Sequence, residues 1–520
     1  MTTRTVVIVG GGTAGWLTAG IIASKNPQVK VSLVESPQVK NLGVGEGTWP
    51  TMRETLRTIG IDELTFLARC QASFKQGSKF VGWREVDGPA YYDPFTVPNG
   101  YGQYNLASHF DDISETERAR WFAHRVSPQP AVCEAGKAPK TLQMAGYACA
   151  LNYGYHLDAG AFVTLLHEHC TTNLSVNYVS AHVECIHSHA SGAIRSLQLD
   201  DGQCLAGDLF IDCSGFASVL IGKHYQIPLT GCQDVLFNNR ALAVQVEHQD
   251  PQQPLAATTL ATAQPAGWIW DIALTHRRGI GHVYSSEYAE DEEIHEALMR
   301  YIEQDKSLAS HTVTPRKISF TPGYRTRFWH HNCVAIGVSA GFVEPLEATA
   351  LVLIEKSAQW IAHQLPGSAD AMEILAHRFN TLTTRRWQEI IDFLKLHYAL
   401  NKRTDSRYWC DHRQPQSWPS SLRDSLTLWQ TQPPWIYDSL DKHELFSAAS
   451  QQYVLYGMGY ATTTTQHTDA AQAMRLFKDT ERQAGKLMAG LPDLRSYLKQ
   501  IQQTYQQTTS KKPPALIPRH

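Results

Sequence analysis

Three glycines near the start of the sequence have the spacing of a phosphate-binding turn. Gly10, Gly12 and Gly15 follow the β-branched run Thr5–Val9. In such a fingerprint the first glycine makes the tight turn, the second lets the backbone approach a pyrophosphate, and the third lets a helix pack closely on the strand. Glu35 ends the next strand-like run, where a carboxylate accepts hydrogen bonds from ribose hydroxyls. The pattern predicts a dinucleotide site.

The position of this fingerprint favours FAD over a nicotinamide cofactor. It lies at the start of the sequence, and later strand ends at Cys213-Ser214-Gly215 and Gly337-Val338-Ser339 are typical of FAD enzymes. No second Gly-x-Gly-x-x-Gly pattern is present for NADH or NADPH, so electrons must reach the flavin from elsewhere. The predicted cofactor contacts are Gly10, Gly12, Thr13, Ala14, Gly15, Glu35, Gly47, Val183, Val338 and Leu351.

Two alternate tryptophans mark a second chemical feature. The segment Gly267-Trp268-Ile269-Trp270-Asp271-Ile272 reads as a strand, and alternate side chains of a strand point to one face. Trp268 and Trp270 would therefore form a rigid aromatic wall. Taken alone, the segment is also compatible with ordinary core packing.

Four segments together carry a family resemblance. They are Gly43 to Pro50 (GVGEGTWP), the run around Phe74-Lys75 (ASFKQGSKFVGW), the two-tryptophan segment, and Phe342 to Thr349 (FVEPLEAT). With the glycine fingerprint they resemble the flavin-dependent tryptophan halogenases over nearly the whole chain, less closely in the last third. The resemblance implies that reduced FAD and O₂ oxidise chloride or bromide to hypohalous acid, which crosses an internal channel to an aromatic substrate. It also implies a separate flavin reductase that supplies FADH₂.

The resemblance assigns roles to particular residues. Lys75 matches the family's catalytic lysine, which hydrogen-bonds the oxidant or becomes a haloamine, and burial would bring its pKa toward neutrality. Glu347 matches the catalytic glutamate, which orients the oxidant or takes the ring proton as a general base. Taken as bare residues, a lysine is usually solvated, and acids such as Glu344 and Glu347 commonly start helices.

The halide site and the wall follow from the same resemblance. Backbone amides of Thr349 and Ala350 would hold chloride or bromide near the start of a helix. Here Ala348-Thr349-Ala350 replaces the family's Ser-Thr-Gly, so a β-carbon at Ala350 narrows the halide pocket. Trp268 and Trp270 would keep the organic substrate away from the flavin.

The substrate end departs further from the family. Phe95 is predicted to stack on the substrate ring, Asp93 stands where the family has histidine, and Phe446 is the predicted match to the family's tryptophan. The tyrosine pair and glutamate that grip the amino-acid group are not recognisable between residues 438 and 456. An electron-rich aromatic ring, tryptophan or another indole, is expected, and acceptance of free tryptophan is left open. His156 is interpreted as structural.

Two other functions remain as alternatives at this point. A flavin monooxygenase of the same fold would need its substrate to pass Trp268 and Trp270 to reach the flavin. A flavin-binding protein without halogenating activity would explain the altered substrate positions. The presence of both Lys75 and Glu347 speaks against the latter.

These residues need an α/β fold to position them, of the FAD/NAD(P)-binding Rossmann type with mixed sheets and a largely helical C-terminal subdomain. Residues 1–365 are predicted to bind FAD and form the oxidant, with a loop-rich insertion at about 85–140; residues 366–510 would cover the substrate, and 511–520 would be a flexible tail. Periodicity predicts the following elements. Strands are expected at Thr5–Val9, Val29–Glu35, Val176–Cys185, Ile194–Leu199, Asp208–Asp212 and Cys333–Val338, and helices at Trp16–Ser24, Glu347–His363, Asp370–Ala399 and Ala470–Gln507.

Composition sets the remaining expectations. The 520 residues carry a formal net charge of −3 without a block of like charges, which disfavours a nucleic-acid partner. The ten cysteines form no CxxC pair, which argues against zinc and a disulfide framework. Neither a signal peptide nor a run of apolar residues long enough for a membrane span is recognised, so a cytoplasmic enzyme is expected. The sequence does not decide the oligomeric state, and a homodimer is retained as one option.

Overall fold

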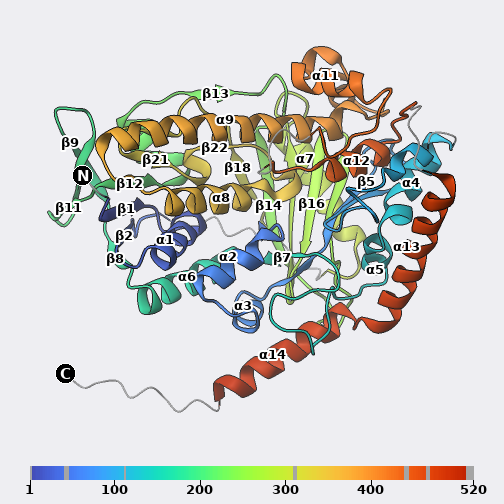
Figure 1. Cartoon of the computed structure of the whole chain (residues 1–520), viewed down its shortest axis with the longest axis horizontal. Coiled ribbons are helices and arrows are strands. Elements are labelled where there is room, and N and C mark those ends of the chain that lie inside the picture. Colours follow the sequence, from blue (N-terminus) through green and yellow to red (C-terminus); the bar gives the residue numbers. More distant parts are fainter. Residues whose placement is uncertain are drawn as a thin grey trace.

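The computed structural model describes residues 3–39, 46–110, 113–308, 313–438, 444–463 and 469–510. Residues 43–45 of the GVGEGTWP segment and the predicted tail at 511–520 lie outside these ranges. Two sheets dominate the described part, one near the N-terminus and one at the centre of the molecule (Figure 1). Helices cover both.

The first sheet has six strands in the order β20-β21-β12-β1-β2-β8. All neighbours pair in parallel except β20 and β21, which are antiparallel. Strand β1 lies in the middle, and its apolar residues are buried on both faces, as parallel strands between helices require. This confirms the predicted Rossmann-type fold. The strands are β1 (Thr5–Val9), β2 (Lys30–Glu35), β8 (Asn177–Ser180), β12 (Leu209–Asp212), β20 (Trp329–His330) and β21 (Cys333–Ala335).

The second sheet has seven strands in the order β18-β14-β17-β16-β15-β5-β6. Only the β15–β5 pair is parallel. One face packs on helix α7 (Asp291–Gln304) through Ile269, Ile294 and Leu298, and the other faces the rest of the molecule. The strands are β5 (Gly77–Val81), β6 (Tyr91–Pro94), β14 (Arg240–Glu247), β15 (Thr259–Gln264), β16 (Gly267–Ala273), β17 (Arg277–Tyr284) and β18 (Arg316–Ser319).

Three small sheets connect these layers. The most important for the site has the order β3-β7-β4, and it places Gly47 and Lys75 on either side of one strand. The strands of the small sheets are β3 (Glu46–Gly47), β4 (Ser73–Lys75), β7 (Gly154–Leu157), β9 (Val183–Ser188), β10 (Ile194–Leu199), β11 (Cys204–Ala206), β13 (Leu229–Gly231), β19 (Gly323–Arg325) and β22 (Gly341–Phe342).

The helices differ from the predicted ones mainly at their ends. The predicted C-terminal helix is two helices, because Pro492 lacks the backbone N–H that would continue the first. The remaining helices are α1 (Thr13–Lys25), α2 (Thr51–Ile59), α3 (Glu63–Arg69), α4 (Glu115–Val126), α5 (Gln129–Glu134), α6 (Ala159–Asn173), α8 (Thr349–His363), α9 (Ala369–Ala399), α10 (Arg407–His412), α11 (Ser420–Leu428), α12 (Ala448–Gly457), α13 (Ala470–Gly490) and α14 (Leu494–Ser510).

The segment 85–140 has long loops, and between them it contributes strand β6 to the large sheet and forms α4 and α5. Two further predictions need correction. The strand predicted at Val176–Cys185 is two strands, β8 and β9, which belong to different sheets. The strand predicted to reach Val338 stops at Ala335, and the chain turns at Gly337, where φ is +73°.

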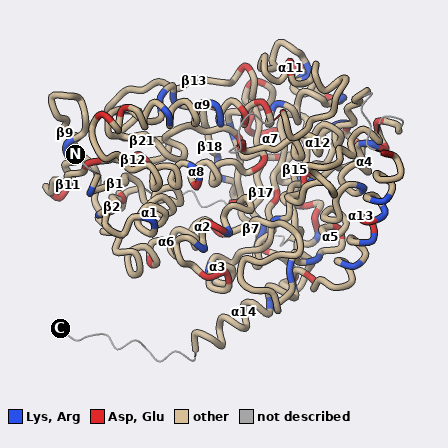
Figure 2. The backbone as a smooth tube through the Cα atoms, viewed as in Figure 1, with Lys and Arg blue, Asp and Glu red and all other residues tan. Residues whose placement is uncertain are grey.

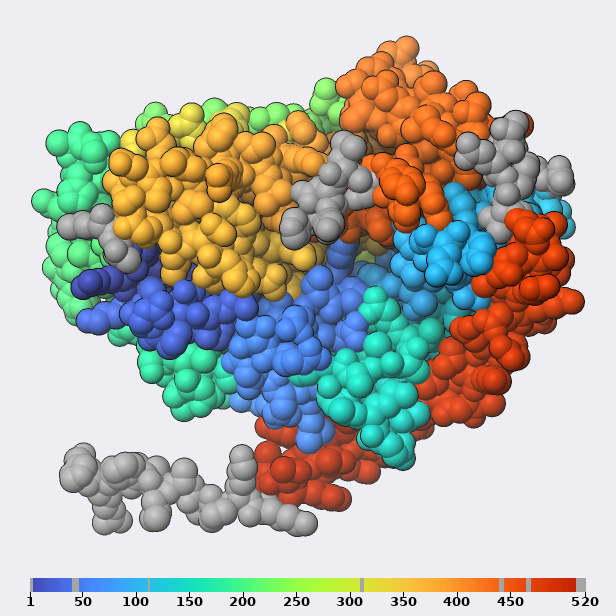
Figure 3. Space-filling view, viewed as in Figure 1, coloured from blue at the N-terminus to red at the C-terminus, as the bar shows by residue number. Residues whose placement is uncertain are grey.

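One hydrophobic core crosses the predicted boundary at residue 365. The turn between α8 and α9 does lie there, but the largest buried cluster contains residues from Val6 to Leu498. The space-filling view shows the α8–α9 segment lying directly against the N-terminal segments (Figure 3). The C-terminal helices therefore share a core with the sheets.

The surface shows charges of both signs. Lysine and arginine are interspersed with aspartate and glutamate along most of the fold (Figure 2). No helix in the described ranges has the length and apolar character needed to cross a bilayer.

Candidate functional site

The glycine turn has the geometry that the sequence predicts. Gly10 has φ +119°, and a β-carbon there would lie 2.3 Å from the carbonyl oxygen of Cys213. A β-carbon at Gly15 would lie 1.8 Å from the Gly10 oxygen, so α1 can approach β1 only because this residue is glycine. Gly12 precedes α1 in an extended conformation. The first N–H groups of α1, including those of Thr13 and Ala14, therefore have no acceptor within the helix.

Glu35 lies beside the glycine turn, where its carboxylate can accept hydrogen bonds from a ribose. A β-carbon at Gly11 would lie 2.4 Å from both carboxylate oxygens of Glu35, so the acid reaches the glycine turn itself. Burial raises the pKa of Glu35, while a hydrogen bond from Tyr178 opposes that shift. Val183 is half-buried at the start of β9, just beyond the backbone bond between Ala181 N–H and the Glu35 carbonyl.

A second group of predicted cofactor contacts lines the same side. A β-carbon at Gly337 would lie 2.9 Å from the Ala14 β-carbon and 3.7 Å from Ile354, so the segment holding Val338 touches both α1 and α8. Leu351 is buried in the first turn of α8. We call the glycine turn, Glu35 and the Gly337 segment the cradle around α1, and its backbone donors and acid suit a dinucleotide.

Lys75 lies at the end of β4, fully buried. Strand β7 pairs with both β4 and β3, which puts Lys75 near Gly47. A β-carbon at Gly47 would lie 3.6 Å from Lys75 Nζ and 3.4 Å from the Ala348 β-carbon. Gly47 therefore lies between Lys75 and Ala348, the residue before α8. A β-carbon there would be in van der Waals contact with both.

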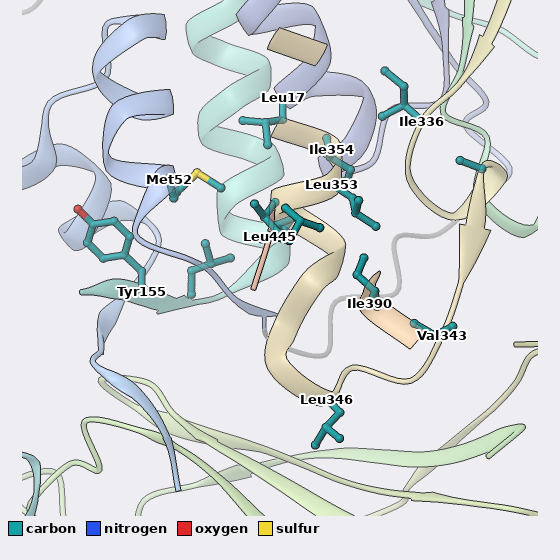
Figure 4. Packing of buried hydrophobic residues seen from close by; sticks show 14 of the residues in the cluster. Leu17, Met52, Tyr155, Ile336, Val343, Leu346, Leu353, Ile354, Ile390 and Leu445 are labelled. Carbon is teal, nitrogen blue, oxygen red and sulfur yellow. The ribbon is translucent and has the colours of Figure 1, made fainter. Parts of the chain in front are cut away.

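Glu347 precedes α8 in a strained conformation. Its φ and ψ are 63° and 10°, and those of Ala348 are 52° and 46°. Two successive non-glycine residues in the left-handed region cost about 1–3 kcal/mol each, which surrounding contacts must offset. The Trp49 indole N–H donates to the Glu347 carbonyl oxygen at 2.8 Å, and Leu346 is buried, pointing toward the large sheet (Figure 4).

This backbone turn directs the Glu347 carboxyl into a buried polar cluster. Ser78 Oγ donates to Oε2 at 3.1 Å, and His397 Nε2 lies 3.7 Å from Oε1. Burial lowers the pKa of His397 to about 3, so the imidazole is neutral and the contact is no ion pair. Nδ1 of the same ring shares a 2.8 Å hydrogen bond with the Tyr91 hydroxyl.

The ionisable groups of the cluster shift one another's pKa values. Burial lowers the pKa of Lys75, opposed by the charges of Glu347 and Asp93. Burial raises the pKa of Glu347 to about 7, opposed by Lys75 and the Ser78 hydrogen bond. The pKa of Asp93 is also raised, first by burial and then by Glu347. An amine whose pKa is lowered beside a carboxyl whose pKa is raised to about 7 is an arrangement suited to general acid and base chemistry.

The two tryptophans share one sheet face with this cluster. Trp270 pairs with Ala261, which pairs with Phe80, and Phe80 pairs with Tyr91. Residues paired across a sheet lie on the same face, so Trp268 and Trp270 are on the face that carries Ser78 and Asp93. Trp270 lies directly over Gly281, where a β-carbon would come within 2.1 Å of the indole ring.

The comparisons with known proteins agree with this arrangement. The family model described as tryptophan halogenase matches residues 5–474. The chain is 32% identical to tryptophan 7-halogenase RebH of Lentzea aerocolonigenes, over 78% of each chain. A crystal structure of a tryptophan halogenase from Shewanella frigidimarina is 43% identical, with a TM-score of 0.92 over 96% of this chain and 98% of that one. A flavin-dependent halogenase from Xanthomonas campestris, Xcc4156, is 30% identical, with a TM-score of 0.86 over 96% of this chain and 99% of that one.

The chain belongs to the tryptophan halogenase family. It is an enzyme, a flavin-dependent halogenase, and its cofactor is FAD. The dinucleotide cradle described above fits that cofactor, and the resemblance predicted from the four segments is confirmed.

The predicted halide residues lie at the N-terminus of α8. Thr349 and Ala350 begin this helix, so neither N–H has an acceptor within it. Ala350 is exposed, and Ala348 is the residue whose β-carbon faces Gly47 and Lys75. Halide binding by Thr349 and Ala350 stays a prediction.

The predicted stacking residues lie in different surroundings. The Phe95 ring centroid is 5.4 Å from Lys75 Nζ, so this ring adjoins the lysine. Phe446 is buried, stacked on Phe393 at 3.8 Å and edge-on to Trp49 at 5.0 Å. Phe446 contacts Trp49, and Trp49 in turn donates its hydrogen bond to the Glu347 carbonyl oxygen. Substrate stacking by either ring stays a prediction.

Glu344 and His156, which were not predicted to be catalytic, make hydrogen bonds within the protein core. Glu344 accepts hydrogen bonds from Tyr398 and Asn238, and burial raises its pKa to about 7. His156 is buried in β7, and its Nε2 shares a 2.9 Å hydrogen bond with Thr259. Burial and the Lys75 charge lower the pKa of His156, in keeping with a neutral supporting residue.

Sequence reasoning missed three contributors to the site: Ser78, His397 and Trp49. Ser78 follows Lys75 closely, but only strand pairing shows that it faces Glu347. His397 lies in the last turn of the predicted helix Asp370–Ala399, where a core histidine is the commoner outcome. Trp49 belongs to the GVGEGTWP segment, one of the four that carry the family resemblance. This was the only sequence feature that could have pointed to a role in the site.

Proposed function

We propose that this halogenase uses FADH₂ from a separate flavin reductase, O₂, and chloride or bromide to halogenate an electron-rich aromatic ring, tryptophan or another indole. The supporting observation is the convergence of Lys75 and Glu347 on the sheet face that carries Trp268 and Trp270. Reduced FAD, when bound, supplies with O₂ the two-electron oxidation of halide to hypohalous acid.

The cradle around α1 would hold the cofactor. The first N–H groups of α1, at Thr13 and Ala14, would donate to the pyrophosphate, and Glu35 would accept from the ribose. Gly47, Val338 and Leu351 line the side toward α8, and Val183 lies at the Glu35 end. Thr349 and Ala350 would donate backbone hydrogen bonds to the halide, whose negative charge the helix N-terminus favours.

Lys75 would deliver the oxidant to the ring. As an ammonium it donates a hydrogen bond, then a proton, to the oxygen of hypohalous acid, which makes the halogen electrophilic. The ring carbon forms a bond to the halogen while the oxygen–halogen bond breaks and water leaves. Burial lowers the lysine pKa, so this proton transfer is easier than from a solvated lysine.

Glu347 would complete the substitution. Its carboxylate takes the proton from the halogenated ring carbon, which restores aromaticity, and then returns that proton to the Lys75 amine. Its pKa of about 7 suits both transfers near neutral pH. Ser78 holds the carboxylate, and the strained turn at Glu347 and Ala348 keeps it directed at the lysine.

The test combines the protein with a flavin reductase, FAD, NADH, O₂ and chloride or bromide, and looks for halogenated tryptophan or indole by mass spectrometry. Lys75→Ala should lose product while FAD binding persists. Lys79→Ala is the matched control, because Lys79 lies on the following strand, β5, with its ammonium over Tyr92 on the face opposite Ser78. Product that persists in Lys75→Ala would refute the mechanism, and a halide-independent oxygenated product would favour the monooxygenase alternative.

A further inference from the structure

Asp93 is a buried acid opposite Ser78 in the β5–β6 pair. Paired residues on neighbouring strands have β-carbons about 4.5–5.5 Å apart. Ser78 donates to Glu347, so Asp93 lies beside that contact. Lys75 and Glu347 both act on its charge, and Phe95, near Lys75, follows it in sequence. The acid therefore belongs to the same buried cluster as Lys75 and Glu347.

The side chain has an acceptor that no group of the described chain satisfies. Asp93 is 7% exposed, and its Oδ1 is buried without a hydrogen-bond partner among the described residues. A buried polar atom without a partner costs about 1–3 kcal/mol, so such atoms in a native protein call for an explanation. At this location, beside Lys75 and Glu347, a bound ligand that donates a hydrogen bond to Oδ1 would explain the missing partner.

Two acceptors near Lys75 have no hydrogen-bond donor among the described residues, Asp93 Oδ1 and Glu347 Oε1. Glu347 Oε1 lies 3.7 Å from the neutral His397 ring, and its carboxyl is the proposed base for the ring proton. Asp93 Oδ1 is then the acceptor that has no other proposed role.

We propose that Asp93 determines substrate specificity by accepting a hydrogen bond from the ring N–H of the aromatic substrate. This assignment rests on the proposed halogenation and deepens it, because it selects indoles over rings without a ring donor. The accepted N–H fixes the rotation of the ring in its plane, so one edge faces Lys75. The same contact draws electron density toward the ring carbons and favours electrophilic attack.

The experiment compares indole with 1-methylindole, which lacks the donor. The ratio of kcat/KM for the two rings is measured for the wild type and for Asp93→Leu, so that differences in intrinsic reactivity cancel. Loss of a hydrogen bond to a carboxyl should reduce the preference for indole by about tenfold to hundredfold. Asp93→Leu also removes a charge that raises the Lys75 pKa, and this effect cancels in the ratio because both rings react at the same lysine. Asp93→Asn, which keeps an acceptor oxygen, should retain most of the preference.

Tyr92→Phe is the matched control, because Tyr92 lies on the other face of β6 and bonds to Glu134. It should leave the ratio unchanged. An unchanged ratio in Asp93→Leu would overturn the proposal.

A binding measurement keeps the inference testable if Asp93→Leu does not fold. Calorimetric titration of the wild type should show tighter binding of indole than of indene, in which a CH₂ group replaces the N–H. Equal binding of the two rings would overturn the Asp93 assignment. Absence of any halogenated product from the wild type would instead refute the proposed function, and the titration would still decide the assignment of Asp93.

Discussion

Substitution of Gly47 by alanine should separate oxidant formation from halogenation. The new β-carbon would lie 3.4 Å from the Ala348 β-carbon, 3.5 Å from Lys75 Cδ and 3.6 Å from Lys75 Nζ. These are ordinary van der Waals distances, and Gly47 is not among the glycines with positive φ. We therefore expect normal folding, with a melting temperature equal to or slightly above that of the wild type, because alanine reduces the entropy of the unfolded chain.

The methyl group would nevertheless occupy the space between the halide residues and Lys75. A methyl group takes up about the volume of one water molecule, roughly 30 Å³. Hypohalous acid is larger than water, so its transfer past Gly47 should slow. We expect the halogenation rate to fall at least about tenfold, an added barrier of about 1.4 kcal/mol. FAD binding and oxygen consumption should stay near wild-type values.

The assay follows three quantities in one reaction: NADH-driven oxygen consumption, halogenated indole by mass spectrometry, and hypohalous acid captured by a small-molecule trap in solution. The fraction of consumed oxygen that appears as halogenated product should drop in Gly47→Ala. Gly485→Ala is a matched control, because a β-carbon at Gly485 meets nothing within 4 Å. A wild-type product fraction in Gly47→Ala would show that the oxidant does not pass Gly47.

Three further substitutions probe the parts of the site separately. Ser78→Ala removes a hydrogen bond that lowers the pKa of Glu347, so the acidic limb of the pH–rate profile, near pH 7, should move to higher pH; an unmoved limb would contradict the role of Glu347 as the base. Gly15→Ala should abolish FAD binding, measured by fluorescence, because its β-carbon would lie 1.8 Å from the Gly10 oxygen. Glu355 is fully buried with a pKa raised to about 7, so its stabilising effect is complete below its unfolded value near 4.5 and is lost as pH rises through 7. Glu355→Gln removes this pH dependence. The melting temperature of the variant minus that of the wild type should therefore be larger at pH 8 than at pH 5, measured by thermal denaturation at the two pH values.

The sequence was sufficient for the cofactor half of the molecule. The turn at Gly10 to Gly15 is specified by local sterics and strand–helix periodicity, both of which a sequence shows directly. The strand of Trp268 and Trp270 was also predictable, since alternation determines which residues share a face. What could not be read is which strands become neighbours, because pairing joins segments far apart in the chain.

The site itself shows why that limit matters. Ser78 meets Glu347 only because the turn before α8 reaches strand β5, and the two residues are 269 positions apart in the chain. The predicted helix start at Glu347 was wrong by two residues, and the difference is functional, since Glu347 and Ala348 adopt left-handed conformations. Local propensity favours a right-handed start for both residues, and tertiary contacts override it.

The strained turn explains how one short segment can serve both the proposed halide site and the Lys75 cluster. A regular helix beginning at Glu347 would project its carboxyl and its free N–H groups along related directions. The left-handed pair at Glu347 and Ala348 breaks that relation. The carboxyl turns toward Ser78 and the Lys75 cluster, while the N–H groups of Thr349 and Ala350 remain at the helix start. The same short segment would then hold the proposed halide donors at the helix start and the proposed general base beside Lys75, and the strain is the structural cost of that separation.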